Sequence, residues 1–152
     1  MNILEALAAC AGSWRGTNKL QDPMNNLAED SAGTATVTPL LGGRFVRMDY
    51  TWEYQGKPQE GSLLIGFDPK TDTAAAHWID SWHMGRQVMV CSGKGSDGKL
   101  AVTGSYAAPP GPDWGWRIEI TPEGEGGLVM VMYNIWPEGR EDLAMEARYG
   151  RG

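Results

Sequence analysis

Residues 44–54, RFVRMDYTWEY, alternate large apolar or aromatic side chains with polar ones. One face would carry Val46, Met48, Tyr50, Trp52 and Tyr54. The positions between them hold Arg, Asp, Thr and Glu. A period of two residues is typical of a β-strand with one buried face and one solvated face. This stretch therefore predicts an all-β protein in which the apolar face of the strand lines the interior.

Nine further stretches have a similar length and composition, and turns rich in Gly, Pro or Asp separate them. The ten expected strands span residues 14–20, 32–38, 44–54, 59–67, 73–82, 85–92, 99–106, 114–121, 127–136 and 141–151. Short connectors favour antiparallel neighbours, and a long meander avoids exposed edges most simply by closing on itself. The prediction is an all-β, antiparallel, up-and-down barrel of about ten strands. A two-sheet sandwich is the alternative.

Residues 2–11 form the segment that predicts a helix. Asn2 can cap it, and Glu5 stands three residues later, as in a capping box. Because the segment is too short to be stable alone, we expect it to cover one end of the barrel. With no internal repeat or linker in view, residues 1–152 are expected to form a single domain.

Composition argues against several kinds of partner. The formal net charge is −6, the pI is about 4.8, and Lys and Arg do not cluster. Nucleic-acid binding needs a basic footprint, so neither nucleic acid nor a membrane is expected as a partner. Cys10 and Cys91 are far apart in the sequence, which favours two buried thiols in a cytoplasmic protein.

Residues 73–92, TAAAHWIDSWHMGRQVMVCS, hold both histidines and two of the seven tryptophans. Trp78 and Asp80 lie two residues apart on an expected strand, so they share its inward face. His77 takes the outward face. This inward pair is the sharpest candidate for a functional site.

A carboxylate inside a barrel needs partners, because an unpaired buried charge is very costly. Arg44, Glu146 and Arg148 are the candidates for Asp80. Such a cluster could orient the polar end of a ligand, or raise the pKa of a carboxyl that acts as a base. Alternatively, Asp80 forms a structural pair with an arginine or caps the turn that follows its strand.

The two histidines offer little support for a metal site. His77 and His83 have no Cys or acidic residue at ligand spacing, so no metal is expected. His83 falls at the tip of an expected hairpin near one mouth of the barrel. There it could be a portal residue, a proton acceptor or a solvated loop histidine. No G-x-S-x-G elbow or convincing Ser–His–Asp order is present.

Large, soft side chains are either simple core or the wall of an apolar cavity. A ten-stranded barrel is wide for side chains alone to fill, which favours a cavity. The wall candidates include Met48, Met89, Met130 and Trp136. The predicted ligand-binding residues are Arg44, Tyr50, Trp52, Trp78, Asp80, His83, Trp116, Met132 and Glu146.

Four short motifs resemble a known family. They are Gly12-Ser13-Trp14, Leu41-Gly42-Gly43-Arg44-Phe45, Gly66-Phe67-Asp68-Pro69 and Trp78-Ile79-Asp80-Ser81. The first resembles the G-x-W start of lipocalins and other calycins. The set, with the terminal EARYGR, is similar to a bacterial calycin-like family of similar length and unassigned function. The resemblance runs from Leu7 to Arg151 and implies a barrel in which Arg148 or Arg151 stacks on Trp14.

Two related families differ from this chain at their ligand sites. Nitrobindin-type haem calycins also begin G-x-W-x-G, but their iron needs a histidine on the last strands, and residues 141–152 contain none. No haem or other cofactor is therefore expected. Fatty-acid-binding barrels use an Arg-x-Tyr pair, whereas Arg148 and Tyr149 are adjacent and point to opposite faces.

Three functions remain open from the sequence. The first is a soluble protein that binds a small apolar or aromatic molecule inside the barrel, with Arg44, Asp80 and Glu146 holding its polar end. The second is an enzyme that uses the same cavity, with Asp80 or Glu146 as general base and His83 at the mouth. The third is an interaction module without a cavity, in which the Pro-rich loop 107–113 meets a partner or a second subunit of a homodimer.

Overall fold

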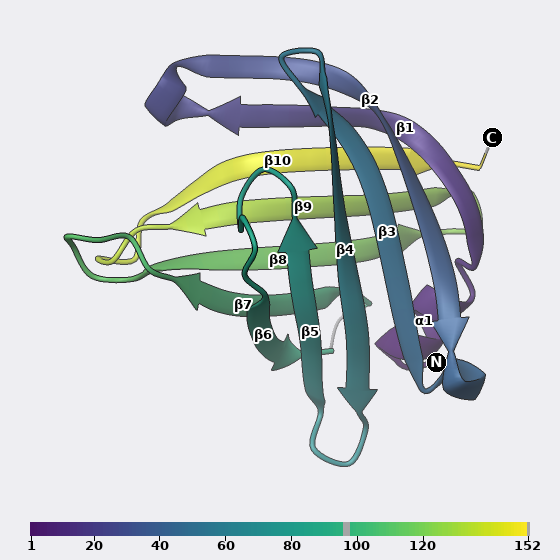
Figure 1. The fold of residues 1–152 in the computed structure, drawn as a ribbon. Helices are drawn as coiled ribbons and strands as arrows, with labels where there is room; N and C mark the ends of the chain where they lie inside the picture. Colours follow the sequence, from purple (N-terminus) through teal and green to yellow (C-terminus); the bar gives the residue numbers. More distant parts are fainter. Residues whose placement is uncertain (96–97, 152) are drawn as a thin grey trace.

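The computed structural model describes residues 1–95 and 98–151, and it is a closed antiparallel β-barrel with a short N-terminal helix (Figure 1). Each strand pairs with the next along the chain, and β1 pairs with β10 to close the ring. The predicted barrel is therefore confirmed. The elements are α1 (Ile3–Ala8), β1 (Gly12–Asp22), η1 (Pro23–Asn25), β2 (Leu27–Leu40), η2 (Leu41–Gly43), β3 (Phe45–Tyr54), β4 (Lys57–Asp68), β5 (Thr73–Asp80), β6 (Met89–Lys94), β7 (Leu100–Tyr106), β8 (Trp114–Glu123), β9 (Gly127–Ile135) and β10 (Glu141–Gly150).

The predicted alternation of buried and exposed side chains is present in β3. Val46, Met48, Tyr50 and Trp52 are buried, and the side chains between them are exposed or half-buried. β3 pairs with β2 on one side and β4 on the other, so its inward face meets the inward faces of both neighbours. Other strands repeat the pattern, and their inward side chains form one continuous core.

Several strand boundaries differ from the prediction. Residues 21–30 were expected to be a loop, but β1 continues to Asp22 and β2 begins at Leu27, with the turn η1 between them. Pro39 lies within β2 opposite Val46 instead of ending the strand. β6 begins only at Met89, because residues 81–88 fold as a turn. Part of the expected connector 93–98, residues 96 and 97, lies outside the described residues.

Helix α1 covers one end of the barrel, as expected. The Oδ1 atom of Asn2 accepts a hydrogen bond from the backbone N–H of Glu5 at 2.9 Å, which confirms the predicted cap. Its buried face contacts β2, β3 and β4. Figure 1 shows α1 beside the end of β2 and the start of β3. Among the described residues, no helix has the length and apolar character needed to cross a membrane.

Trp14 seals the same end of the barrel. Its Nε1 donates to the carbonyl of Cys10 at 2.8 Å, and the guanidinium of Arg151 lies 4.1 Å from the centre of its ring. Arg151 also donates to the carbonyl of Ala11 at 2.9 Å. The residue that stacks on Trp14 is therefore Arg151. Arg148 lies on the outer surface instead.

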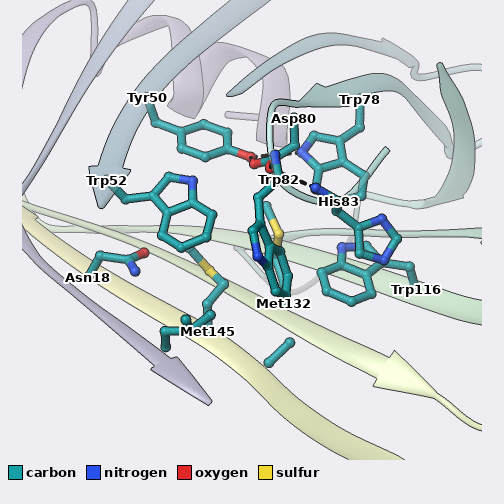
Figure 2. Close-up of a pocket in the computed structure, with 12 residues that line it drawn as sticks. Asn18, Tyr50, Trp52, Trp78, Asp80, Trp82, His83, Trp116, Met132 and Met145 are labelled. Carbon is teal, nitrogen blue, oxygen red and sulfur yellow. Dashed lines mark hydrogen bonds between the residues drawn. The ribbon is translucent and has the colours of Figure 1, made fainter. Parts of the chain in front are cut away.

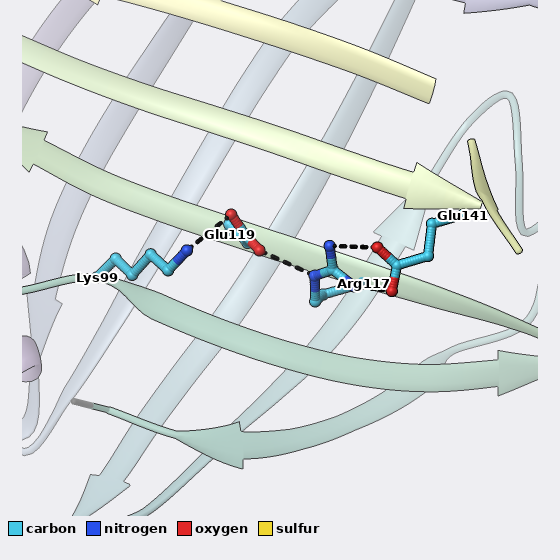
Figure 3. A network of polar contacts seen from close by, with 4 residues as sticks. All are labelled: Lys99, Arg117, Glu119 and Glu141. Atoms are coloured by element: carbon cyan, nitrogen blue, oxygen red, sulfur yellow. Dashed lines mark hydrogen bonds and ion pairs between the residues drawn. The ribbon is translucent and has the colours of Figure 1, made fainter. Parts of the chain in front are cut away.

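A chain of ion pairs crosses the outer surface of the barrel (Figure 3). Lys99 contacts Glu119 at 3.2 Å, and Glu119 contacts Arg117 at 2.8 Å. Arg117 donates two hydrogen bonds to Glu141, at 2.6 and 2.9 Å, and this pairing lowers the pKa of Glu141. The network links β8 to the start of β10, and because it is partly solvated its contribution to stability is small.

Replacing Arg151 by methionine should remove the stacking on Trp14 and the hydrogen bond to the Ala11 carbonyl. We expect a loss of about 1 kcal/mol in the free energy of unfolding, measured by urea denaturation. The matched control is Arg148→Met, which disrupts only exposed ion pairs and should cost about 0.5 kcal/mol or less. Equal losses in the two variants would contradict a sealing role for Arg151.

Candidate functional site

A chain of hydrogen bonds joins β3, β5 and the turn after β5 at the end of the barrel opposite α1 (Figure 2). The Nε1 of Trp78 donates to the hydroxyl of Tyr50 at 2.9 Å. That hydroxyl donates to Oδ2 of Asp80 at 2.5 Å. The other oxygen of Asp80, Oδ1, accepts from the backbone N–H groups of Trp82 and His83 at 2.8 and 3.2 Å. Both carboxylate oxygens are therefore engaged by the protein itself.

Gly61 makes the contact between Tyr50 and Asp80 possible. In the sheet register Gly61 lies between them, opposite Tyr50 on β3 and opposite Asp80 on β5. A Cβ atom at this position would overlap the hydroxyl and ring of Tyr50. The missing side chain therefore leaves the space through which the tyrosine reaches across β4 to the carboxylate.

Asp80 holds the turn that follows β5, as one of the sequence interpretations has it. Burial raises the pKa of its carboxyl, while the hydrogen bonds from Tyr50 and from the backbone of Trp82 and His83 oppose that rise. Asp80 is only 7% exposed. The carboxylate is thus a structural bridge between β3 and the turn.

The prediction that Arg44, Glu146 or Arg148 pairs with Asp80 is wrong. Arg44 is exposed, and it precedes β3 six residues before Tyr50, which lies at the level of Asp80. Glu146 and Arg148 face the solvent, where they form an ion pair at 3.3 Å. The reason lies in β10: its register shifts between Leu143 and Met145, after which the odd-numbered residues point inward.

The turn at residues 81–88 folds back into the mouth of the barrel. The ring of Trp82 lies 5.7 Å from that of Trp52 and 5.4 Å from that of Tyr54. Met84, in the same turn, is buried, and its N–H donates to the carbonyl of Asp80 at 3.4 Å. Residues 81–88 therefore act as a plug, which we call the mouth turn.

His83 enters the barrel with the mouth turn. Its ring lies 4.3 Å from Trp116, 4.7 Å from Tyr106 and 5.2 Å from Trp78, measured between ring centres. Burial lowers the pKa of its imidazole to about 4, so the ring is neutral at pH 7. The interpretation of a solvated loop histidine is wrong. His77, by contrast, is exposed on the outer face as predicted.

The interior behind the mouth turn is almost filled. The space left between its side chains is about 20 Å³, which is room for about one water molecule. Bulky aromatic and methionine side chains occupy the width that ten strands create. The lining residues are Asn18, Leu20, Tyr50, Trp52, Trp78, Asp80, Trp82, His83, Trp116, Met132, Ala144 and Met145. Seven of the nine predicted site residues are among them, and Arg44 and Glu146 are not.

Three buried polar atoms around this space have no hydrogen-bond partner among the described residues. They are Nδ2 of Asn18, Nδ1 of His83 and Nε1 of Trp116. Asn18 and Trp116 are only 2% and 4% exposed. Figure 2 shows Asn18 on one side of the space and His83 with Trp116 on the other. Unpaired buried polar groups are rare in native proteins, so water or a ligand group is expected beside them.

Asn18 was missed in the sequence, although a signal was present. It lies on the expected strand 14–20, four residues after Trp14 and two before Leu20, and it therefore shares their inward face. A polar residue in an otherwise apolar inward row is a candidate site residue.

A groove of about 400 Å³ lies outside the plug, at the mouth. It shares Trp82, His83, Trp116 and Ala144 with the interior space, so these side chains form its floor. The rings of Trp114 and Trp136 lie 4.4 Å apart along its wall. The full lining is Gln21, Asp22, Pro23, Met24, Asn25, Trp82, His83, Tyr106, Trp114, Trp116, Asn134, Trp136, Asp142, Leu143 and Ala144.

Sequence reasoning missed most of the groove because it sought the site inside the barrel. Tyr106 and Trp114 lie at the facing ends of β7 and β8, whereas Asp142 comes from β10, far away in the sequence. Only the aromatic residues that flank the Pro-rich loop 107–113 hinted that such residues gather there.

Fold and site together define the class: a closed β-barrel that is plugged at its mouth and carries an aromatic groove above the plug. The chain belongs to the DUF1579 family, described as a protein of unknown function, which matches residues 3–151. No curated protein sequence matches it.

The structure is also similar to the crystal structure of Rv2717c from M. tuberculosis. The TM-score is 0.63, the sequence identity is 13%, and the match covers 99% of this chain and 97% of that one. At this identity the similarity concerns the fold alone. In the described part of the chain, no group of three or more His, Cys, Asp or Glu side chains is placed to hold a metal ion.

Replacing Gly61 by alanine should displace Tyr50 and break its hydrogen bond to Asp80. We expect a loss of about 2–3 kcal/mol in the free energy of unfolding and a change in the near-UV circular dichroism of the tryptophans. The control is Gly126→Ala, since an added Cβ there meets nothing within 4 Å. If both variants unfold at the same urea concentration, the account of Gly61 fails.

The buried imidazole of His83 should make the protein sensitive to acid. Its folded-state pKa of about 4 lies below the ordinary value of 6.5, so the unfolded chain binds the proton first. The free energy of unfolding should therefore fall by about 2 kcal/mol as the pH drops from about 6.5 to about 4. This value is smaller than the full pKa difference implies, because solvent screens the exposed part of the ring.

This loss should vanish in His83→Phe when unfolding free energies are compared at pH 7 and pH 4. Asp80, whose pKa is raised, shifts stability in the opposite direction, but it is present in both proteins and cancels in the difference. His77→Phe, which changes an exposed ring, is the matched control. A His83→Phe variant that keeps the full acid sensitivity would refute the assignment.

Proposed function

We propose that this chain is a calycin-like binding barrel that takes a small, flat, largely apolar molecule into the groove at its mouth. The observation that carries the proposal is the groove itself, about 400 Å³ in volume and lined by four tryptophans and Tyr106. Ligand sites of small molecules are typically apolar and aromatic concavities of this size. Aromatic side chains stack on flat ligands and contribute stabilisation beyond simple burial.

The groove is a better location for a ligand than the interior expected from the sequence. The interior space of about 20 Å³ is far too small for a drug-sized molecule. The groove lies directly above it, and Trp82, His83 and Trp116 separate the two. A ligand in the groove would therefore rest on Trp82 and on two of the residues that were expected to surround it inside the barrel, His83 and Trp116.

The groove also offers polar atoms that can orient a ligand. Asn134 accepts from the hydroxyl of Tyr106 at 2.6 Å, and Asp142 accepts from Nε1 of Trp136 at 2.8 Å. These bonds hold the walls in place while leaving other polar atoms of the same side chains for a ligand. A few placed polar groups in an aromatic pocket are what gives such sites their specificity.

Binding accounts for these residues better than catalysis does. A general base needs a free lone pair near the substrate, whereas both oxygens of Asp80 accept hydrogen bonds from the protein. Glu146, the other expected base, pairs with Arg148 on the outer surface. We therefore favour a binding protein, with residues 1–152 acting as one domain because β1 and β10 join its two ends.

The test is isothermal titration calorimetry with 2-naphthalenemethanol, a neutral and flat probe. We expect saturable binding, and a loss of about tenfold in affinity in Trp114→Ala, because one wall of the groove is removed. Phe45→Ala is the matched control, since Phe45 lies at the other end of β3 and outside the groove. Equal binding by both variants, or no binding by the unaltered protein, would refute the proposal.

A further inference from the structure

The charges that line the mouth groove are of one sign. Asp22 and Asp142 are acidic, and no Lys or Arg is among the described lining residues. His83, in the floor, is neutral at pH 7 because burial lowers its pKa to about 4. A ligand in this groove therefore meets two carboxylates, one of which, Asp142, has the guanidinium of Arg140 beside it at the rim.

Asp22 is held in a way that leaves one oxygen available. It is only 7% exposed, and its Oδ2 accepts from Nδ2 of Asn25 at 2.8 Å and from the hydroxyl of Tyr54 at 3.0 Å. Its Oδ1 takes part in no side-chain hydrogen bond found among the described residues. The carboxylate is thus fixed in position at the edge of the groove, and its Oδ1 remains available as a hydrogen-bond acceptor.

Asp142 stands beside a cation that the rim already holds. The guanidinium of Arg140 lies 3.7 Å from the centre of the Trp136 ring, and its Nε lies 3.9 Å from Oδ1 of Asp142. Trp136 in turn donates to Oδ2 of the same carboxylate. An aromatic face paired with a carboxylate therefore already binds one organic cation at this rim.

The remaining aromatic residues of the groove provide the same chemistry. The faces of aromatic rings carry negative electrostatic potential and attract cations, most strongly in desolvated sites. Trp82, Trp114 and Trp116 line the groove together with the two carboxylates. An anionic ligand would instead be buried next to two like charges, which is unfavourable.

We propose that the natural ligand of the mouth groove is an organic cation, a molecule with a flat or apolar body and a protonated or quaternary amine. The amine would lie between the tryptophan faces and the carboxylates of Asp22 and Asp142. This inference rests on the proposed function, because it names the class of ligand for the same groove. The main competing explanation is that the two carboxylates serve only the local structure of the rim.

Three probes with the same ring system separate these explanations. They are 2-naphthylmethylammonium, 2-naphthalenemethanol and 2-naphthoate, which differ mainly in charge. We expect calorimetric titration to show the ammonium binding about 5- to 30-fold more tightly than the alcohol, and the carboxylate binding most weakly. The preference for the cation should shrink as salt is added.

Asp142→Asn tests the role of the carboxylate directly. It should lower the affinity for the ammonium about fivefold and lower the affinity for the alcohol by less, because the amide oxygen can still accept the hydrogen bond of Trp136. The matched control is Asp72→Asn, which removes the same charge in the turn between β4 and β5, outside the groove. Thermal unfolding of both variants shows whether each is folded before binding is compared.

The outcomes distinguish the two proposals. If the alcohol binds at least as tightly as the ammonium, the organic-cation inference is overturned while the groove remains a binding site. If Asp142→Asn and Asp72→Asn weaken the ammonium equally, the preference comes from overall charge and the assigned site is wrong. If none of the three probes binds, the proposed function itself fails, and this inference fails with it.

Discussion

The structure at the mouth of this barrel depends on the hydrogen bonds that the carboxylate of Asp80 accepts. One oxygen accepts from Tyr50 of β3, and the other accepts from the backbone of Trp82 and His83. A single side chain therefore couples the sheet to the mouth turn. Because that turn brings two aromatic rings into the barrel, the position of the groove floor follows from the Asp80 contacts. Tyr50 can reach the carboxylate because Gly61 has no side chain in the way.

A ten-stranded ring is wider than its own apolar side chains usually fill. This chain closes one end with a helix and a stacked Trp14–Arg151 pair, and it fills the other with a turn that folds inward. The consequence is that the accessible aromatic surface moves from the interior to the rim. The inward turn also carries a cost, since His83 and Trp116 bury nitrogen atoms that find no partner in the described protein.

Much of the fold could be predicted because alternation is a local property. In β3 and β5 the side-chain period alone correctly indicates which residues point inward, Trp78 and Asp80 included. The short helix could be predicted from its cap and its apolar face. The partners of Asp80 could not be predicted in the same way. Arg44 and Glu146 are chemically suitable, but their location depends on where a strand begins and on a register shift in β10.

The sequence by itself determined a closed, antiparallel β-barrel with a capped N-terminal helix and an inward Trp78–Asp80 pair. The tertiary structure alone decided that Tyr50 pairs with Asp80, that His83 is half-buried among aromatic rings, and that the open space lies at the rim instead of inside. The physical reason is the range of the interactions. Alternation and capping act between residues a few positions apart, whereas strand register and the path of a turn are set by contacts between distant segments.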